Sequence, residues 1–227
     1  MITTVVFDLD DTLYDEQEYC KSGFKAVAHS LSNLVDVLPP DDIFDSLWKQ
    51  FTAGNHTKTF NAAFEDHGIS YDEKLINKMV ETYRSHCPQI SLPPDSRQVL
   101  QQLNGKYVLA LLTDGFLPAQ QLKVQALDIE KYFKTIIYTE QLGRQYWKPS
   151  PAGFEKIISE LNTQPENTVY VADNETKDFI APNKLGFATI QIIRPARIHT
   201  STADNPDAPA RYVIQKITQL PTILEKL

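Results

Sequence analysis

Short apolar runs that each lead into polar, chemistry-bearing residues constrain the fold of this chain more than any other feature. The first run, Val5–Phe7, is followed by Asp-Leu-Asp-Asp-Thr at residues 8–12. Three later clusters follow the same rule: Thr113-Asp114-Gly115 after residues 108–112, Lys148-Pro149 beyond 136–139, and Asp173 with Asp178 after 169–171. Parallel α/β sheets gather their functional residues at the carboxyl ends of their strands. The pattern therefore predicts a parallel sheet with one site at that edge.

The chain beyond Pro93-Pro94 alternates between strand-like and helix-like segments, the order expected of successive βαβ units. Strands are predicted at 107–112, 135–139, 168–171 and 188–193, with an edge strand at 212–214. Helices are predicted at 119–127, 152–161 and 217–227, and residues 199–209 are predicted to form a mobile surface loop. This order indicates an α/β fold with a Rossmann-like parallel sheet.

A different apolar period occupies the region between residues 16 and 86. Phe24, Val27, Leu31 and Leu34 recur at helical spacing, and two similar stripes follow after Pro39-Pro40. Prolines and glycines divide the region into about four predicted helices. We therefore expect a core domain of residues 1–14 and 92–227, with an inserted α-helical bundle at 15–91.

Charge and composition narrow the classes of function. The 227 residues carry a formal net charge of −7, with no Lys/Arg stripe, which disfavours nucleic-acid binding. The chain lacks the pattern of a signal peptide and any apolar run of membrane-spanning length, so a cytoplasmic protein without a membrane partner is expected. Cys20 and Cys87 form neither a disulfide framework nor a zinc-binding pattern.

Asp8 and Asp10 carry the strongest chemical signal. Alternate residues of an extended chain project to the same side, so these two carboxylates are expected to share one small space. A hard divalent cation such as Mg²⁺ would relieve their repulsion. The alternative for the segment is an Asp-rich turn that caps a helix near Thr12.

The other clusters also have structural interpretations. Residues 113–115 could form a turn at the end of a strand, and Lys148 could be a solvated loop lysine. Asp178 could solvate the loop ahead of Pro182. The functional interpretation depends on the four clusters taken together.

Together, the four clusters resemble the motifs of the haloacid dehalogenase (HAD) superfamily of phosphatases and phosphotransferases. Residues 8–12 resemble the first motif, Asp-x-Asp-x-Thr. Thr113 and Lys148 match the second and third motifs, and Asp173 with Asp178 matches the acidic fourth. The resemblance covers the whole chain and places the helical region where the family carries a C1-type cap. Ala172 departs from the pattern, since family members usually carry glycine there, and a methyl group is small enough for the loop to be kept.

The resemblance implies a role for each matching residue. Asp8 would be the nucleophile that forms an aspartyl-phosphate, and Asp10 the general acid and then the base. Thr113 and the main chain of Asp114 would bind the phosphoryl group, and Lys148 would balance its charge. Mg²⁺ would be held by Asp8, the main-chain carbonyl of Asp10 and Asp173, with Asp178 steadying either the water shell of the metal or Lys148.

The substrate is expected to be a small phosphorylated metabolite, such as a sugar phosphate or a nucleotide, and the protein a monomer or homodimer. Arg84 and His86 are candidates for substrate binding, because they lie near a predicted hinge of the cap; by the same criterion Tyr14, Tyr19 and Lys21 also qualify. Three other functions stay open: a phosphomutase, a haloacid dehalogenase, and a catalytically silent binding protein. Asp10 argues against the dehalogenase, which generally lacks this second carboxylate.

Overall fold

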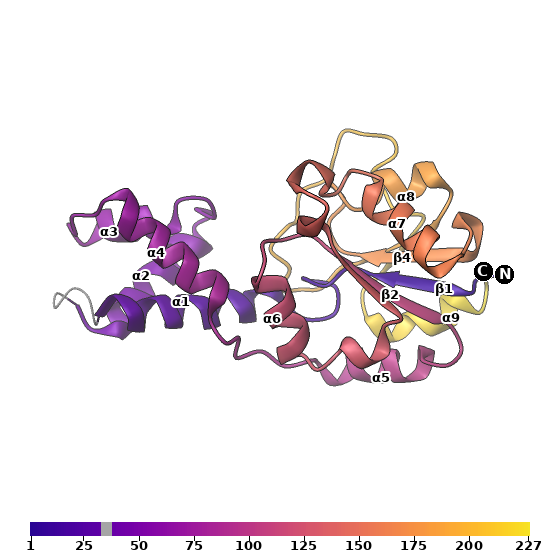
Figure 1. Ribbon diagram of the computed structural model, residues 1–227, viewed down its shortest axis with the longest axis horizontal. Helices are drawn as coiled ribbons and strands as arrows, with labels where there is room; N and C mark the ends of the chain where they lie inside the picture. The colour runs from indigo at the N-terminus through magenta and orange to yellow at the C-terminus, as the bar shows by residue number, and fades with distance from the viewer. Residues whose placement is uncertain (33–37) are drawn as a thin grey trace. The chain divides into compact units, whose positions relative to one another are not determined.

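The computed structural model describes residues 1–32 and 38–227, which divide into two compact units (Figure 1). Residues 1–17 and 91–227 form an α/β unit, and Glu18–Ile90 form a helical unit. Leu34, predicted on an apolar helical stripe, lies outside the described residues. No helix in the described part of the chain has the length and apolar character needed to cross a membrane.

The α/β unit is built on a six-stranded parallel sheet in the order β3-β2-β1-β4-β5-β6, which confirms the predicted fold class. Its strands are β1 (Thr4–Phe7), β2 (Val108–Thr113), β3 (Thr135–Tyr138), β4 (Thr168–Ala172), β5 (Ala188–Ile192) and β6 (Tyr212–Ile214). The central strand β1 pairs with β2 on one side and β4 on the other, in register Phe7 with Leu111 and Val171. The predicted strands therefore lie within about one residue of the observed ones at their ends.

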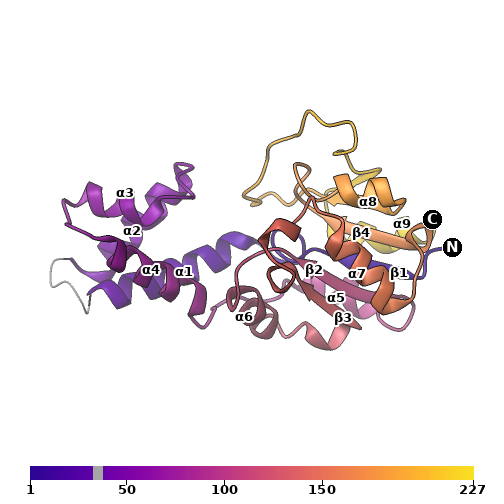
Figure 2. The same cartoon turned by 45° about the horizontal axis from the view of Figure 1, so that its top comes forward.

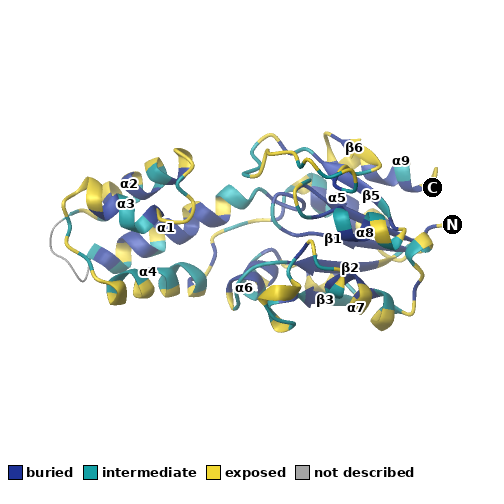
Figure 3. Cartoon of the chain, turned by 90° about the horizontal axis from the view of Figure 1, so that it is seen from above, coloured by how far each residue is buried: buried dark blue, intermediate teal, exposed yellow. Residues whose placement is uncertain are grey.

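Helices cover both faces of the sheet, α7 and α8 on one and α5 and α9 on the other (Figures 1 and 2). They are α5 (Pro94–Leu103), α6 (Ala119–Ala126), α7 (Ala152–Leu161), α8 (Ile180–Leu185) and α9 (Leu220–Leu224). Under α7 and α8, Val6, Ala110, Tyr170 and Ala172 pack with Phe154, Phe179 and Phe187 in one buried cluster. The inner strands are buried on both sides (Figure 3), as parallel sheets require.

The C-terminal segment differs from its prediction as one helix over 217–227. A 3₁₀ turn, Ile217–Gln219, leads into α9, which ends at Leu224. Pro221 explains the break, because it has no N–H to bond the carbonyl of Ile217 and fits only the first turn of a helix. α5, which was not predicted, likewise begins with a proline, Pro94, in its first turn.

The helical unit contains α2 (Pro40–Thr52), α3 (Thr59–Asp66), α4 (Glu73–Ser85) and most of α1 (Glu16–Ser32). Phe24 of α1 lies at the centre of an aromatic cluster, with ring contacts to Phe51, Phe60 and Tyr83. Polar groups in the unit also bond within it: both ring nitrogens of His86 are engaged, one with the carbonyl of Tyr83 at 2.7 Å and one with Ser22 Oγ at 3.0 Å. This unit is thus held by an aromatic core of its own.

Candidate active site

The sheet brings the four sequence clusters to one edge. Asp8 follows β1, Thr113 ends β2, and Asp173 follows β4. β1 lies between β2 and β4, so the chain crosses to opposite sides of β1 at this point, which is where open α/β sheets bind ligands. Lys148 precedes α7, and Asp178 precedes α8. The structure therefore assembles residues that lie up to 170 positions apart in the sequence.

A tight turn follows β1. The main-chain N–H of Leu13 bonds the carbonyl of Leu9 at 3.0 Å, and Asp11 takes a left-handed conformation with φ 51°, which Asp tolerates better than most residues. The Asp11 carboxylate accepts main-chain N–H groups from Glu16 at 2.8 Å and from Ile198 at 2.6 Å. Asp11 thus fixes the loop that carries Asp8 and Asp10 to α1 and to the segment after β5.

Asp8 and Asp178 share one buried lysine. Lys148 Nζ lies 2.6 Å from Asp8 Oδ1, 2.7 Å from Asp178 Oδ1 and 2.9 Å from the hydroxyl of Tyr170. Burial raises the pKa of Asp8 to about 7, although Lys148 acts in the opposite direction. Burial also opposes ionisation of Asp178, but Lys148 and Lys177 outweigh it and hold the pKa of Asp178 below its usual value. The pair of carboxylates and the lysine together carry a net negative charge.

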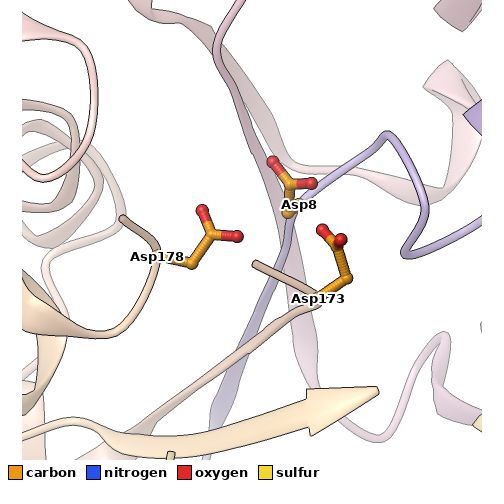
Figure 4. A group of neighbouring side chains, drawn as sticks. All are labelled: Asp8, Asp173 and Asp178. Carbon is orange, nitrogen blue, oxygen red and sulfur yellow. The ribbon is translucent and has the colours of Figure 1, made fainter. Parts of the chain in front are cut away.

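Asp173 completes a cluster of three buried carboxylates. Oxygens of Asp8, Asp173 and Asp178 all lie within 4.8 Å of one another, and the three side chains point toward a common space (Figure 4). Asp173 Oδ2 is buried and finds no hydrogen-bond partner among the residues that the structure describes. Burial, followed by the charges of Asp178 and Asp8, raises the pKa of Asp173 to about 9. Buried polar atoms normally have a partner, so this donor set fits a hard divalent cation.

Asp10 has a different environment. Lys123 Nζ, from α6, donates to both of its carboxylate oxygens at 2.8 and 2.9 Å. Gln120 Nε2 donates to it at 2.9 Å and the hydroxyl of Tyr14 at 2.5 Å. Burial disfavours the charged form, but these donors outweigh it and hold the pKa of Asp10 below its usual value. The Asp10 carboxylate is therefore kept ionised and is turned toward α6.

Gln120 joins the first and second motifs. Its side-chain amide also donates to Thr113 Oγ1 at 2.6 Å. Gly115, with φ 140°, makes this approach possible, since a Cβ there would lie 2.7 Å from the Gln120 side chain. The second motif is joined to the third through Asp114, whose carboxylate accepts the main-chain N–H of Lys148 at 3.2 Å. Thr139 Oγ1 also donates to that carboxylate, at 2.8 Å.

Ala172 lies in the core of the α/β unit. It is the last residue of β4, it is fully buried, and its methyl group belongs to the core cluster under α7 and α8. The loop that follows is closed by hydrogen bonds between Asn174 and Asp178, from the Asn174 N–H to Asp178 Oδ2 at 3.0 Å and from the Asp178 N–H to the Asn174 carbonyl at 2.9 Å. Loss of the usual glycine therefore leaves Asp173 and Asp178 in one compact turn.

Comparison with known protein families shows which family this chain belongs to. The family model described as "Haloacid dehalogenase-like hydrolase" matches residues 5–192, most of the chain. The chain belongs to the haloacid dehalogenase-like hydrolases. The match spans all four clusters and confirms the resemblance drawn from them.

Similar proteins match this hydrolase over 92% or more of its length. A glyceraldehyde 3-phosphate phosphatase from Methanopyrus kandleri is 27% identical over 216 residues, 92% of this chain and 91% of the relative. An N-acylneuraminate-9-phosphatase from Mus musculus is 24% identical over 241 residues, 100% of this chain and 95% of the relative. The HAD-hydrolase YfnB from Bacillus subtilis, solved bound to magnesium, has the same fold, with a TM-score of 0.71, 21% identity and 98% of each chain covered.

Several groups of the site were not anticipated from the sequence of the hydrolase. A cavity of about 80 Å³ at the strand ends is lined by Asp8, Asp10, Asp114 and Asp173, and also by Asp11, Glu16, Asn174, Lys177 and His199. Burial and then the charge of Asp10 raise the pKa of Glu16 to about 8. One signal in the sequence could have placed Gln120 and Lys123 together, because polar residues three apart on a helix lie on the same face.

Arg84 and His86 belong to the helical unit of the hydrolase. Arg84 is half-buried in the last turn of α4, and His86 directly follows that helix. The hydrogen bonds of His86 to Ser22 and Tyr83 give it a structural part within the unit. Substrate contact by either residue stays a prediction.

Proposed function

We propose that this chain is a Mg²⁺-dependent phosphatase that hydrolyses a small phosphomonoester through an aspartyl-phosphate on Asp8. The observation that carries the proposal is the arrangement of Asp8 and Asp10. Two carboxylates two residues apart each meet a buried lysine, yet only Asp8 lies in the cluster that fits a cation. One carboxylate is thus suited to attack and the other to proton transfer.

In the first half-reaction, an oxygen of Asp8 attacks phosphorus and the bond from phosphorus to the leaving alcohol breaks. Lys148 balances the charge of Asp8 through its 2.6 Å contact. Asp10 first takes up a proton from solvent, which requires its carboxyl group to turn away from at least one of its present donors, and then gives that proton to the departing oxygen. Thr113, held by Gln120 at 2.6 Å, and the main chain of Asp114 orient the phosphoryl group.

In the second half-reaction, water attacks phosphorus and restores the Asp8 carboxylate as inorganic phosphate forms. Asp10 accepts the proton of that water, for which the ionised form, favoured by its lowered pKa, is the competent one. Alternating these two roles is the ordinary behaviour of a general acid-base residue.

Mg²⁺ would be held by Asp8, Asp173 and the main-chain carbonyl of Asp10, with Asp178 beside it. When bound, the ion would supply charge stabilisation for the transferring phosphoryl group. The unpartnered oxygen of Asp173 supports this assignment, and so does its pKa, which burial and then the charges of Asp178 and Asp8 raise. The magnesium-bound YfnB structure, which shares the fold, adds support.

The named relatives support the phosphatase over the alternatives, since they are called phosphatases of small phosphorylated molecules. Asp10 also disfavours the dehalogenase, because a departing halide needs no proton. We further propose that residues 15–91 act as a C1-type cap that selects the leaving group, and that the enzyme works in the cytoplasm as a monomer or homodimer. The aromatic, self-contained core of Glu18–Ile90 is consistent with a cap that moves as a unit.

A panel of metabolite phosphates tests the proposal. Purified protein should release phosphate from some of them with Mg²⁺ and lose that activity with excess chelator. Asp173→Asn should weaken Mg²⁺ binding by about 10-fold or more, because a ligand charge is removed. Lys184→Met, which removes an exposed lysine paired with Asp207 at 3.3 Å, is the control and should change neither. Equal phosphate release with and without chelator would overturn the metal assignment.

A further inference from the structure

Lys148 is the lysine that the motifs assign to the phosphoryl group, but its hydrogen-bonding capacity is already used. An ammonium group has three N–H donors. Those of Lys148 meet Asp8 at 2.6 Å, Asp178 at 2.7 Å and Tyr170 at 2.9 Å, and the side chain is almost fully buried. Lys148 can therefore lend charge to the site, but a cationic donor to the oxygens of a bound phosphoryl group has to come from another residue.

The acidic lining of the cavity makes a positive charge beside a bound phosphoryl group still more important. Six of its lining residues carry carboxyl groups: Asp8, Asp10, Asp11, Glu16, Asp114 and Asp173. A phosphate dianion would meet strong repulsion there without positive charge facing it. Its volume of about 80 Å³ is several times the roughly 10–15 Å³ that one water needs, so it has room for a small polar group.

Lys177 lines this cavity, and the described residues do not use all N–H donors of its ammonium group. The described residues give its ammonium group one hydrogen bond, a long one of 3.5 Å to Asp114 Oδ2, and its side chain is 35% exposed. Its main chain is fixed, because the Lys177 N–H bonds the carbonyl of Asn174 at 3.3 Å within the turn that carries Asp173 and Asp178. A fixed backbone with a lightly held ammonium group is the arrangement expected of a ligand-binding lysine.

We propose that Lys177 is the cationic anchor of the substrate's phosphoryl group, donating to its oxygens the N–H groups that Lys148 has committed elsewhere. The inference rests on the proposed function and extends it to a residue outside the four motif positions. Lys177 acts on binding, whereas Asp8 and Asp10 carry the chemistry. A charge-assisted hydrogen bond of this kind is strong enough to dominate the affinity for a small anion.

Calorimetric titration of inorganic phosphate into the Mg²⁺-loaded protein tests the anchor directly. Lys177→Met should weaken phosphate binding by about 10- to 100-fold, the range of hydrogen bonds to charged groups. Lys177→Arg, which keeps the charge, should recover most of the affinity. Lys184→Met, a change of equal size in α8, should leave it unchanged.

Titration of Mg²⁺ alone separates an anchor from a structural lysine. Lys177 opposes a cation at the nearby carboxylates, so Lys177→Met should bind Mg²⁺ as tightly as the wild type or more tightly, while it binds phosphate more weakly. A variant that loses affinity for both would show a collapsed loop and overturn the proposal. An Arg variant as weak as the Met variant would overturn the charge-based assignment.

Three further outcomes separate this inference from the proposed function. Unchanged phosphate affinity in Lys177→Met, or a wild type that binds no phosphate, would overturn the anchor. Phosphate binding that depends on Lys177, in a protein that hydrolyses none of the phosphomonoesters tested, would support the anchor and overturn the phosphatase assignment.

Discussion

Asp8 and Asp10 lie two residues apart, and each contacts a buried lysine. Their surroundings nevertheless shift the pKa values of the two carboxyl groups in opposite directions. Lys148 divides its charge between Asp8 and Asp178, and the pKa of Asp8 is raised to about 7 by burial. Lys123 gives two short hydrogen bonds to Asp10, whose pKa is lowered. The charge of Asp178 further raises the pKa of Asp8, whereas Tyr14 and Gln120 add hydrogen bonds that lower the pKa of Asp10.

This difference separates two tasks. On the side of Asp8, Lys148 is shared between two carboxylates, and Asp173 Oδ2 has no hydrogen-bond partner among the described residues. This side is therefore suited to take up a cation and a phosphoryl group. On the side of Asp10, donors within the protein already bond the carboxylate. These donors hold it in place until it exchanges a proton. The predictions below test that division, beginning with the largest effect.

Asp8→Asn should abolish phosphate release, a loss of roughly ten-thousand-fold or more, as expected when a nucleophile is removed. The fold should survive, since the amide has the shape of the carboxylate. Thermal unfolding and steady-state rates on one aryl phosphate measure both. Activity within tenfold of the wild type would remove Asp8 from the role of nucleophile.

Asp10→Asn should lose about a hundred- to ten-thousand-fold on an alkyl phosphate, the usual range for general acid-base catalysis. The loss should be much smaller on an aryl phosphate, whose leaving group needs little protonation. Rates on the two substrate types, compared at saturation, measure the difference. Equal losses on both would contradict the assignment of Asp10 as the acid.

Lys123→Met should lower kcat by about 10- to 100-fold, because Asp10 loses its two shortest cationic contacts. Since Lys123 acts through Asp10, the double variant with Asp10→Asn should be little worse than Asp10→Asn alone. Lys123→Arg is the matched control that keeps the charge. Losses that add in full would show that Lys123 acts independently of Asp10.

Arg84→Ala should have the smallest effect, a rise of a few-fold in KM for the preferred metabolite with kcat kept, because only uniform binding is lost. The same change should leave a small artificial phosphate almost unaffected. Steady-state kinetics on both substrates provide the test. An unchanged ranking of substrates would move the specificity contacts from the helical unit to loops of the α/β unit.

The sequence predicts the fold closely because its two signals are local. Apolar runs that end in polar clusters mark β1, β2 and β4 within about one residue, and the period of residues 152–161 coincides with α7. Asp8, Thr113, Lys148, Asp173 and Asp178 follow from the same signal together with the resemblance to a family.

The remaining site residues depend on tertiary structure. Lys123 contacts a carboxylate 113 positions away, and no local pattern states which side of α6 will face the loop after β1. Lys177 enters the cavity only because the turn from Asp173 to Asp178 closes on itself. A charged residue in a helix or loop is ordinarily solvated, so sequence alone favours the wrong environment for Lys123 and gives no reason to place Lys177 at the cavity.

The most direct measurement is mass spectrometry of peptides from protein that is acid-quenched during turnover of a phosphomonoester with Mg²⁺. A phosphoryl group should be found on the peptide that contains Asp8, it should accumulate further in Asp10→Asn with an aryl phosphate, and it should be absent in Asp8→Asn. Turnover without any phosphorylated Asp8 peptide, together with an active Asp8→Asn variant, would contradict the division of tasks between Asp8 and Asp10.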